Sequence, residues 1–375
     1  MTNLSSRLSP QTLSEALEAA RARLDALADS LPADGWVGPY APTLNPPLWE
    51  YGHIVWFQEH WCLRQKPGRA PDESPLVAPL KDSRMDWADW RYNSSRIPHT
   101  ARWQVPLPSP AETRDWGREV LEAVKARLAR AGDDSELRYF CELSLHHESM
   151  HIEAWWMMWQ SRGLRPPVQP ALPRLVDARP LRFDADRVVL GSPQDAGFVF
   201  DNEKWAHPVE VGAFEIDARP VTNAEFARFV SEGGTPPAHW RAAGAGWELS
   251  RFDRWIALPP EEPVMHVSRA QAEAYALAAG RRLPVAAEWL AASARESFVL
   301  GRCWEWTADA FAPYPGFSAD PYADYSLPWF DGRHAEVRGA GSWVTDPHLA
   351  RPSFRNFYMP ERSDPFIGFR TARGL

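Results

Sequence analysis

The sequence predicts a multidomain protein of class α and α+β, in which a four-helix bundle precedes a loop-rich α+β domain. In the first part of the chain, four long segments place apolar side chains at the three- and four-residue spacing of amphipathic helices. This periodicity ends at a proline-rich stretch, after which short apolar runs alternate with turn residues. Since 375 residues suffice for two domains of ordinary size, we expect domains at residues 1–165 and 178–375.

The helices of the first domain are predicted at residues 10–30, 47–65, 110–130 and 141–160. The second and third begin at prolines, which are favourable at the first position of a helix. Residues 66–110 lack helical periodicity and are expected to be mostly irregular. Four helices with one long crossover form a bundle, and bundle cores are where facing helices build metal sites.

The second domain is predicted to hold two short helices, at residues 222–233 and 268–284, among short strands and turns. The whole sequence contains 20 tryptophans and 36 prolines. This composition favours aromatic-lined pockets in loop-rich structure over a long helical array.

Charge and hydropathy limit the classes of function. The formal charge of −8, with no basic cluster to offset it, argues against a nucleic-acid partner. No apolar run resembles an export signal or approaches the length of a transmembrane helix. The three cysteines form neither a CxxC motif nor an even disulfide set. We therefore expect a soluble cytoplasmic protein without a membrane partner, whose oligomeric state the sequence does not predict.

The strongest chemical signal lies in the predicted helix at residues 141–160. His147 and His151 are four residues apart, so both imidazoles lie on one face and can reach a single metal ion. The run HESMH also matches the HExxH signature of zinc peptidases, in which Glu148 would be the general base. That interpretation needs a third ligand, and no motif places one downstream. The two histidines could also be ordinary residues of an amphipathic helix.

A third ligand is predicted on a different helix. His53 lies among aromatic residues of the helix at residues 47–65, and a bundle would bring it to face His147 and His151. A single histidine in such a setting is more often a core residue than a ligand. The prediction that His53 binds a metal therefore depends on the pair of histidines on the other helix. Three further histidines are weaker candidates: His60, His99 and His146.

The second domain resembles the formylglycine-generating-enzyme fold, a C-type-lectin-like architecture. The matching segments include RPVTNAEFARFV, CWEWTADAF, VRGAGSWVTD and the terminal FIGFRTARG. Formylglycine-generating enzymes carry a cysteine pair just after the GSW segment. This sequence has Thr345 and Ala350 near those places and no cysteine after Cys303. That activity is therefore not expected.

The N-terminal part resembles the DinB-like helix bundles, and LSLHHESMHIE is similar to their metal helix. The two domains in this order, with PYPGFSADPYADYS and RNFYMPERSDPFIGFRTAR, resemble one family in particular. This family contains the iron-dependent sulfoxide synthases of ergothioneine biosynthesis and their relatives, the selenoneine synthases. The resemblance spans nearly the whole chain.

The resemblance implies an Fe(II) ion held by His53, His147 and His151, with O₂ as co-substrate. Three neutral imidazoles suit Fe(II) as well as zinc. The implied acceptor is hercynine, the trimethylated betaine of histidine, whose quaternary ammonium needs aromatic faces. Asn356 and Phe357 match the family's substrate-contacting Asn–aromatic pair.

The resemblance also implies a catalytic tyrosine in the PYxxY segment, which donates a proton or a hydrogen atom during the oxygen chemistry. Tyr322 matches that position, and Tyr325 stands three residues further on. Either tyrosine could instead be an ordinary packing residue of an aromatic-rich loop.

Three departures from the family pattern bear on the chalcogen donor. Met150 replaces a usual glutamine, Tyr358 stands where an aspartate that binds a thiol donor is expected, and residues 82–105 lack the usual basic run. Arg362 matches a retained donor-binding arginine. This sequence therefore lacks some of the charged residues that would bind a charged donor such as γ-glutamylcysteine, which favours a neutral selenosugar as the donor.

The sequence thus predicts a small-molecule enzyme, a non-haem iron oxidoreductase that forms a C–Se bond at imidazole C2 of hercynine in selenoneine biosynthesis. The nearest alternative is an ergothioneine-pathway sulfoxide synthase that forms a C–S bond with cysteine or γ-glutamylcysteine. A zinc hydrolase based on HExxH is a more distant alternative, as is a non-catalytic binding module with a decayed site.

Overall fold

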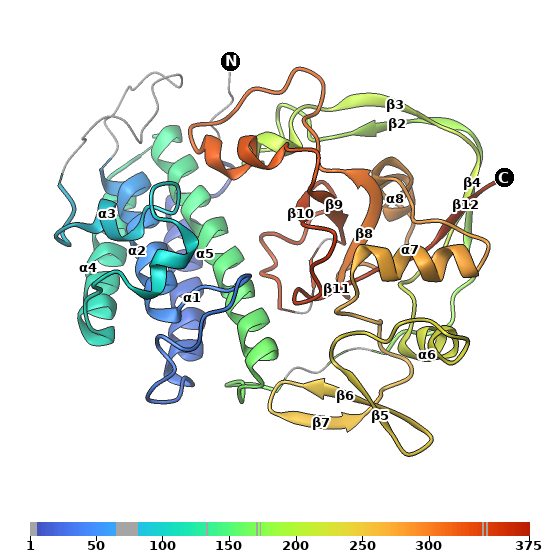
Figure 1. Cartoon of the computed structure of the whole chain (residues 1–375). Helices are drawn as coiled ribbons and strands as arrows, with labels where there is room; N and C mark the ends of the chain where they lie inside the picture. Colours follow the sequence, from blue (N-terminus) through green and yellow to red (C-terminus); the bar gives the residue numbers. More distant parts are fainter. Residues whose placement is uncertain are drawn as a thin grey trace. The chain divides into compact units, whose positions relative to one another are not determined.

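The computed structural model describes residues 6–64, 82–132, 134–169, 172, 174–339, 341–342 and 344–375. The chain forms two compact units (Figure 1). The first contains the residues up to Met158 together with Asp320–Asp324, and the second contains Trp159–Ala319 and Tyr325–Leu375. Long helices make up most of the first unit, while the sheets lie in the second. The predicted class, a helical bundle followed by an α+β domain, is confirmed.

Four long helices build the first unit: α1 (Pro10–Asp29), α2 (Pro47–Leu63), α4 (Pro110–Leu128) and most of α5 (Ser135–Arg162). A proline lies in the first turn of α1, α2 and α4, and serine side chains cap α1 and α4. α4 packs against both α1 and α2. Every residue of α2 except Leu63 is buried, so this helix holds its polar side chains inside the bundle.

In its described part, from residue 82 onward, the segment that the sequence predicts to be irregular contains two short elements. They are α3 (Ala88–Tyr92), which packs against α2, and the 3₁₀ helix η1 (His99–Trp103). Each has five residues, which is too short to produce a helical periodicity. Gln65, the last residue of the predicted helix at 47–65, and residues 66–81 of the predicted irregular segment lie outside the described residues.

The described residues of the second unit form four small sheets, ordered β1-β4-β12, β10-β9-β8-β11, β2-β3 and β5-β6-β7. In the four-stranded sheet, β11 runs parallel to β8 and the other pairs are antiparallel. The strands are β1 (Leu181–Phe183), β2 (Asp186–Leu190), β3 (His207–Val211), β4 (Phe214–Ile216), β5 (Trp240–Ala243), β6 (Gly246–Arg251), β7 (Arg254–Ala257), β8 (Trp304–Ala310), β9 (Ala335–Arg338), β10 (Asn356–Tyr358), β11 (Ile367–Gly368) and β12 (Ala372–Gly374).

Among the described residues, three α-helices accompany these sheets: α6 (Asn223–Ser231), α7 (Arg269–Ala278) and α8 (Ala286–Ser293). The sequence predicts α6 and α7, but α7 ends six residues earlier than expected because Gly280 adopts a left-handed conformation with φ +65°. α8 was not predicted. Among the described residues, no helix combines the length and the apolar character that a membrane crossing requires.

Candidate metal centre

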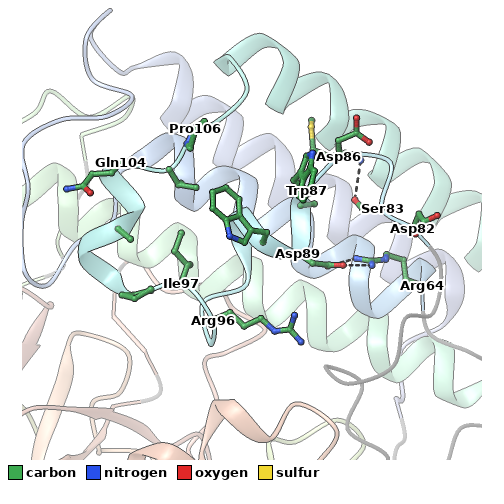
Figure 2. Close-up of a pocket in the computed structure, with 16 residues that line it drawn as sticks. Arg64, Asp82, Ser83, Asp86, Trp87, Asp89, Arg96, Ile97, Gln104 and Pro106 are labelled. Atoms are coloured by element: carbon green, nitrogen blue, oxygen red, sulfur yellow. Dashed lines mark hydrogen bonds and ion pairs between the residues drawn. The ribbon is translucent and has the colours of Figure 1, made fainter.

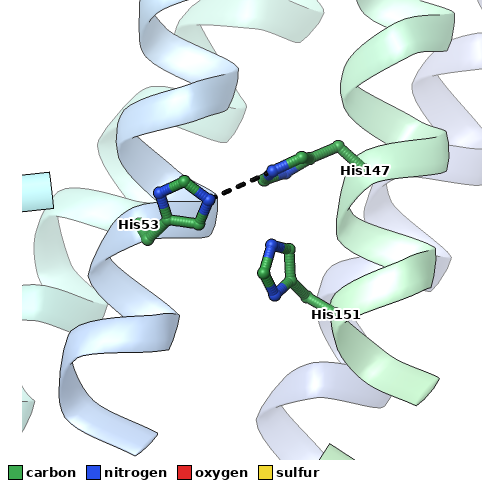
Figure 3. Close-up of side chains that lie close together, drawn as sticks. All are labelled: His53, His147 and His151. Atoms are coloured by element: carbon green, nitrogen blue, oxygen red, sulfur yellow. Dashed lines mark hydrogen bonds between the residues drawn. The ribbon is translucent and has the colours of Figure 1, made fainter. Parts of the chain in front are cut away.

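His53 from α2 and His147 and His151 from α5 lie together in the first unit (Figure 3). One ligand atom from each lies within 4.8 Å of the others, and the two Nε2 atoms of His53 and His147 are 3.2 Å apart. Two nitrogens that each lie about 2.1 Å from one metal ion at about 90–110° are about 3.0–3.4 Å apart. Within the described part of the chain, no other group of three His, Cys, Asp or Glu side chains is placed to hold a metal ion.

Burial keeps two of these imidazoles neutral. It lowers the pKa of His53 and of His147 well below the ordinary value, and electrostatic repulsion between their protonated forms and His151 lowers both further. His53 Nδ1 lies 2.7 Å from the carbonyl oxygen of Tyr92, so Nδ1–H donates there and the lone pair of Nε2 faces His147. Neutral rings with a bare nitrogen are the form in which histidine binds metal.

Aromatic side chains of α2 fix the same two rings. Trp49 stacks on His53 with centroids 5.0 Å apart and planes 8° apart. Phe57 stacks on His147 with centroids 3.6 Å apart and planes 4° apart. The aromatic residues around His53 in the sequence therefore form walls of the site.

His151 is held by a carboxylate that the sequence analysis missed. Its Nδ1 lies 2.6 Å from Glu50 Oε1, and Glu50 is buried on α2. The available signal was that Glu50 precedes His53 by three residues, so both side chains share one face of the helix.

Tyr322 packs beside His147, one of the three clustered histidines. Its ring meets Phe57 edge-on at 4.9 Å and lies 6.3 Å from His147 between centroids. Burial, together with the charge of Asp324, raises the pKa of Tyr322 above its ordinary value, so the phenol is protonated at neutral pH. Its segment is tied to the bundle, because Tyr139 donates to Asp320 at 3.0 Å and Ser95 donates to Asp324.

Tyr325 and the predicted substrate residues other than Met150 belong to the second unit. Tyr325 stacks on Phe200 with centroids 4.1 Å apart. Phe357 on β10 stacks on Phe311 at 4.2 Å, while Asn356 Nδ2 donates to the Tyr358 hydroxyl at 3.3 Å.

Arg362 forms an ion pair that the sequence analysis did not foresee. Its Nε donates to Asp364 Oδ1 at 2.9 Å, and its Nη2 donates to Asp364 Oδ2. The guanidinium also lies 5.1 Å from the centroid of the Tyr358 ring. Met150, on α5, is half-buried.

The remaining candidates lie outside the cluster. Glu148 is fully buried and accepts two hydrogen bonds from Arg21, at 2.7 and 3.2 Å. His99 Nε2–H donates to the Leu44 carbonyl oxygen, 2.8 Å away. His146 Nε2 lies 3.8 Å from Glu142, and His60 lies between Trp56 and Trp61.

A separate pocket of about 700 Å³ lies beside α3 and η1 in the first unit (Figure 2). Trp87, Trp90 and Ile97 form part of its wall. Asp89, also in the wall, accepts hydrogen bonds from Arg64 and from Trp56 Nε1. None of the three clustered histidines lines this pocket.

Two protein-family models match the chain. The DinB superfamily matches residues 16–159, and the sulfatase-modifying factor enzyme 1-like domain matches residues 176–300 and 298–375. A protein named hercynine oxygenase from Mycobacterium tuberculosis is 32% identical, over 97% of this chain and 99% of its own length. The chain belongs to the hercynine oxygenase family. Its two domains are those of the ergothioneine-type sulfoxide synthases, as the sequence resemblance implies.

Two other relatives are either less similar in sequence or similar over a shorter part of this chain. Ergothioneine biosynthesis protein 1 from Schizosaccharomyces pombe is 23% identical over 91% of this chain and 53% of that protein. The formylglycine-generating enzyme of Streptomyces coelicolor is 32% identical, but over only 34% of this chain and 49% of its own. The likeness to formylglycine-generating enzymes therefore covers one part of a hercynine oxygenase architecture.

Proposed function

We propose that this chain is a non-haem iron enzyme that uses O₂ to join a chalcogen atom to C2 of the imidazole of hercynine. The observation that carries the proposal is the three-histidine cluster with a protonated tyrosine, Tyr322, packed beside it. The acceptor is supported by the similarity to a protein named hercynine oxygenase over nearly the whole of both chains.

Fe(II) is the metal that we assign to His53, His147 and His151. Three imidazoles suit Fe(II) and zinc alike, but zinc has no redox chemistry. When bound, Fe(II) would supply electrons for the reduction of O₂. Three protein ligands leave coordination positions free for other groups.

For the acceptor we assign Phe357 and Asn356. Phe357 is surrounded by aromatic rings, with Phe311 at 4.2 Å, Tyr325 at 6.0 Å and Trp329 at 6.1 Å between centroids. Such faces suit the trimethylammonium of hercynine, and a desolvated cation–π contact contributes about 2 kcal/mol. Asn356 carries the amide donor that we assign to the carboxylate of hercynine.

For the donor we propose a selenosugar, that is, a glycosyl selenol. Arg362 is already paired with Asp364 through two hydrogen bonds, so its capacity to bind a further carboxylate is reduced. Tyr358, beside it, offers a hydroxyl and no charge. A γ-glutamylcysteine charge left unpaired in a partly buried site would cost about 1–3 kcal/mol or more. A selenosugar has no such charge outside its selenol.

The net reaction is a four-electron oxidation that consumes one O₂. The hydrogen on hercynine C2 and the hydrogen of the selenol leave with one oxygen atom as water. The new C–Se bond replaces the C–H bond, and the second oxygen atom remains on selenium. Tyr322 is the group of this chain that we assign to proton or hydrogen-atom donation.

The zinc-hydrolase alternative loses support from the contacts of Glu148. A general base must reach a water molecule near the metal, yet both carboxylate oxygens of Glu148 accept hydrogen bonds from the buried guanidinium of Arg21. Glu148 therefore links α5 to α1 through its hydrogen bonds with Arg21.

A donor competition tests the proposal. The protein would be supplied with Fe(II), O₂, limiting hercynine, and a selenosugar and γ-glutamylcysteine at equal concentration, with products identified by mass spectrometry. We expect mainly the hercynyl selenosugar product. Predominant hercynyl sulfoxide would assign the chain to the ergothioneine pathway, and the absence of any hercynine product would contradict the function itself.

A further inference from the structure

We propose that Glu50 is a positioning residue that orients His151 for metal binding, and that Asn45 and Arg102 hold Glu50 in place. The inference rests on the metal centre of the proposed function. It does not depend on the identity of the acceptor or of the donor.

The first step is the direction of the His151 ring. Glu50 Oε1 lies 2.6 Å from His151 Nδ1, and the Glu50 residue is only 2% exposed. A carboxylate accepts, so Nδ1–H donates and the proton is fixed on that nitrogen. Figure 3 shows one nitrogen of His151 turned toward the rings of His53 and His147 and the other turned away. Glu50 thereby leaves Nε2 as the ligand atom and increases its basicity.

The second step is the support of Glu50 itself. A buried carboxylate is stable only with hydrogen-bond partners and a compensating charge. Arg102 Nη1 donates to Asn45 Oδ1 at 2.7 Å, which leaves the amide Nδ2 of Asn45 to donate to Glu50 Oε1 at 3.4 Å. Burial lowers the pKa of Arg102 to about 10, with Glu50 opposing the shift, so Arg102 is still a cation at neutral pH.

The third step is that Arg102 also contacts Trp49, which packs on a second proposed ligand, His53. Its guanidinium lies 4.1 Å from the centroid of the Trp49 ring, and Trp49 stacks on His53. One cation therefore supports His151 through Asn45 and Glu50, and supports His53 through Trp49. His147 differs, because its Nδ1 has no hydrogen-bond partner among the described residues. We infer that Glu50 is the carboxylate that raises the affinity of this metal centre.

The test compares two buried carboxylates of α2. Glu50→Gln keeps the shape of the side chain and removes its charge. Glu59→Gln does the same at a carboxylate that is 1% exposed and accepts hydrogen bonds from Ser83 and from the Arg84 backbone instead. Fe(II) affinity would be measured under anaerobic conditions by competition with a chromogenic chelator. The Co(II)-substituted proteins would be compared by visible absorption.

We expect Glu50→Gln to weaken Fe(II) binding about 10- to 100-fold and to change the Co(II) spectrum. Glu59→Gln should bind both metals as the unmodified protein does. Asn45→Ala, which retains Glu50, should weaken binding to a smaller extent and serves if Glu50→Gln does not fold. Fe(II) affinity of Glu50→Gln within about twofold of the unmodified protein, or equal losses in Glu50→Gln and Glu59→Gln, would overturn the inference. Hercynine is absent from these assays, so a wrong acceptor would not affect their outcome.

Discussion

At the scale of single residues, Tyr322 is the side chain to which we assign the clearest chemical task. Its phenol is protonated at neutral pH, and its ring packs against Phe57 and lies near His147. Hydrogen bonds at both ends of its segment, from Tyr139 and from Ser95, hold the tyrosine against the bundle. A fixed and protonated acid is what proton or hydrogen-atom donation requires.

We expect Tyr322→Phe to retain the affinity for hercynine and to lower the rate of product formation by about 100-fold or more, since general-acid groups contribute about 10²–10⁴. Calorimetry and product analysis measure the two quantities. Tyr325→Phe is the matched control, because Tyr325 stacks on Phe200 in the second unit. Unchanged turnover in Tyr322→Phe, or an equal loss in Tyr325→Phe, would remove the assignment to Tyr322.

A second residue-scale prediction concerns Phe357. Replacing it with leucine retains an apolar side chain but removes the aromatic face. A contact of about 2 kcal/mol corresponds to about a thirtyfold loss of hercynine affinity. Histidine, which lacks the three methyl groups, should bind weakly to both proteins. Equal affinities of the unmodified protein for histidine and hercynine, measured by calorimetry, would refute the aromatic site.

At the scale of the elements, α5 has two functions on different faces. His147 and His151 belong to the three-histidine cluster to which we assign the metal, while Glu148 forms a buried ion pair with Arg21 of α1. Arg21 also donates to the Gly117 carbonyl oxygen on α4, at 3.0 Å. The ion pair therefore joins three helices of the bundle.

Glu148→Gln should destabilise the protein and leave Fe(II) binding intact. The change leaves the charge of Arg21 buried without its partner, which costs about 3–5 kcal/mol. Urea unfolding of the metal-free protein and Fe(II) titration measure the two effects. A normal free energy of unfolding combined with lost catalysis is what a general base would produce, and that result would favour the hydrolase alternative.

The elements also show what the sequence could predict. The long helices and the pair formed by His147 and His151 were predictable, because periodicity and spacing are local properties. α3 and α8 have five and eight residues, too few for a clear period. The attachment of Asp320–Asp324 to the helical unit depends on contacts with residues more than 180 positions away. Such contacts leave no local pattern. For the bond between Glu50 and His151, the local sequence offered only the spacing that places Glu50 on the same helix face as His53.

At the scale of the whole molecule, both units bury histidines that stay neutral. The pKa values of His53 and His147 in the first unit, and of His239 and His266 in the second, all lie below the ordinary value, chiefly because of burial. Below a pH of about 6.5 the unfolded chain takes up protons at these positions, and the folded protein takes them up only at a lower pH. The free energy of unfolding must therefore decrease as the pH is lowered through this range.

We expect the metal-free protein to be less stable at pH 5.5 than at pH 7.5, by up to about 1.4 kcal/mol per pH unit for each histidine. His239→Gln should reduce this dependence, because it removes one titrating group. Chemical unfolding at the two pH values measures the effect. Equal or greater stability at pH 5.5 would contradict the neutral state of the buried histidines.

The central claim, that the chain forms a bond at C2 of hercynine, is tested most directly with hercynine deuterated at C2. The protein would be incubated with this acceptor, Fe(II), O₂ and a selenosugar donor, and the product mass compared with that from ordinary hercynine. A reaction without protein corrects for slow exchange of the deuterium. We predict a hercynyl product that has lost the deuterium. A product that retains it, or the absence of a covalent hercynine product with either a selenium or a sulfur donor, would contradict the account.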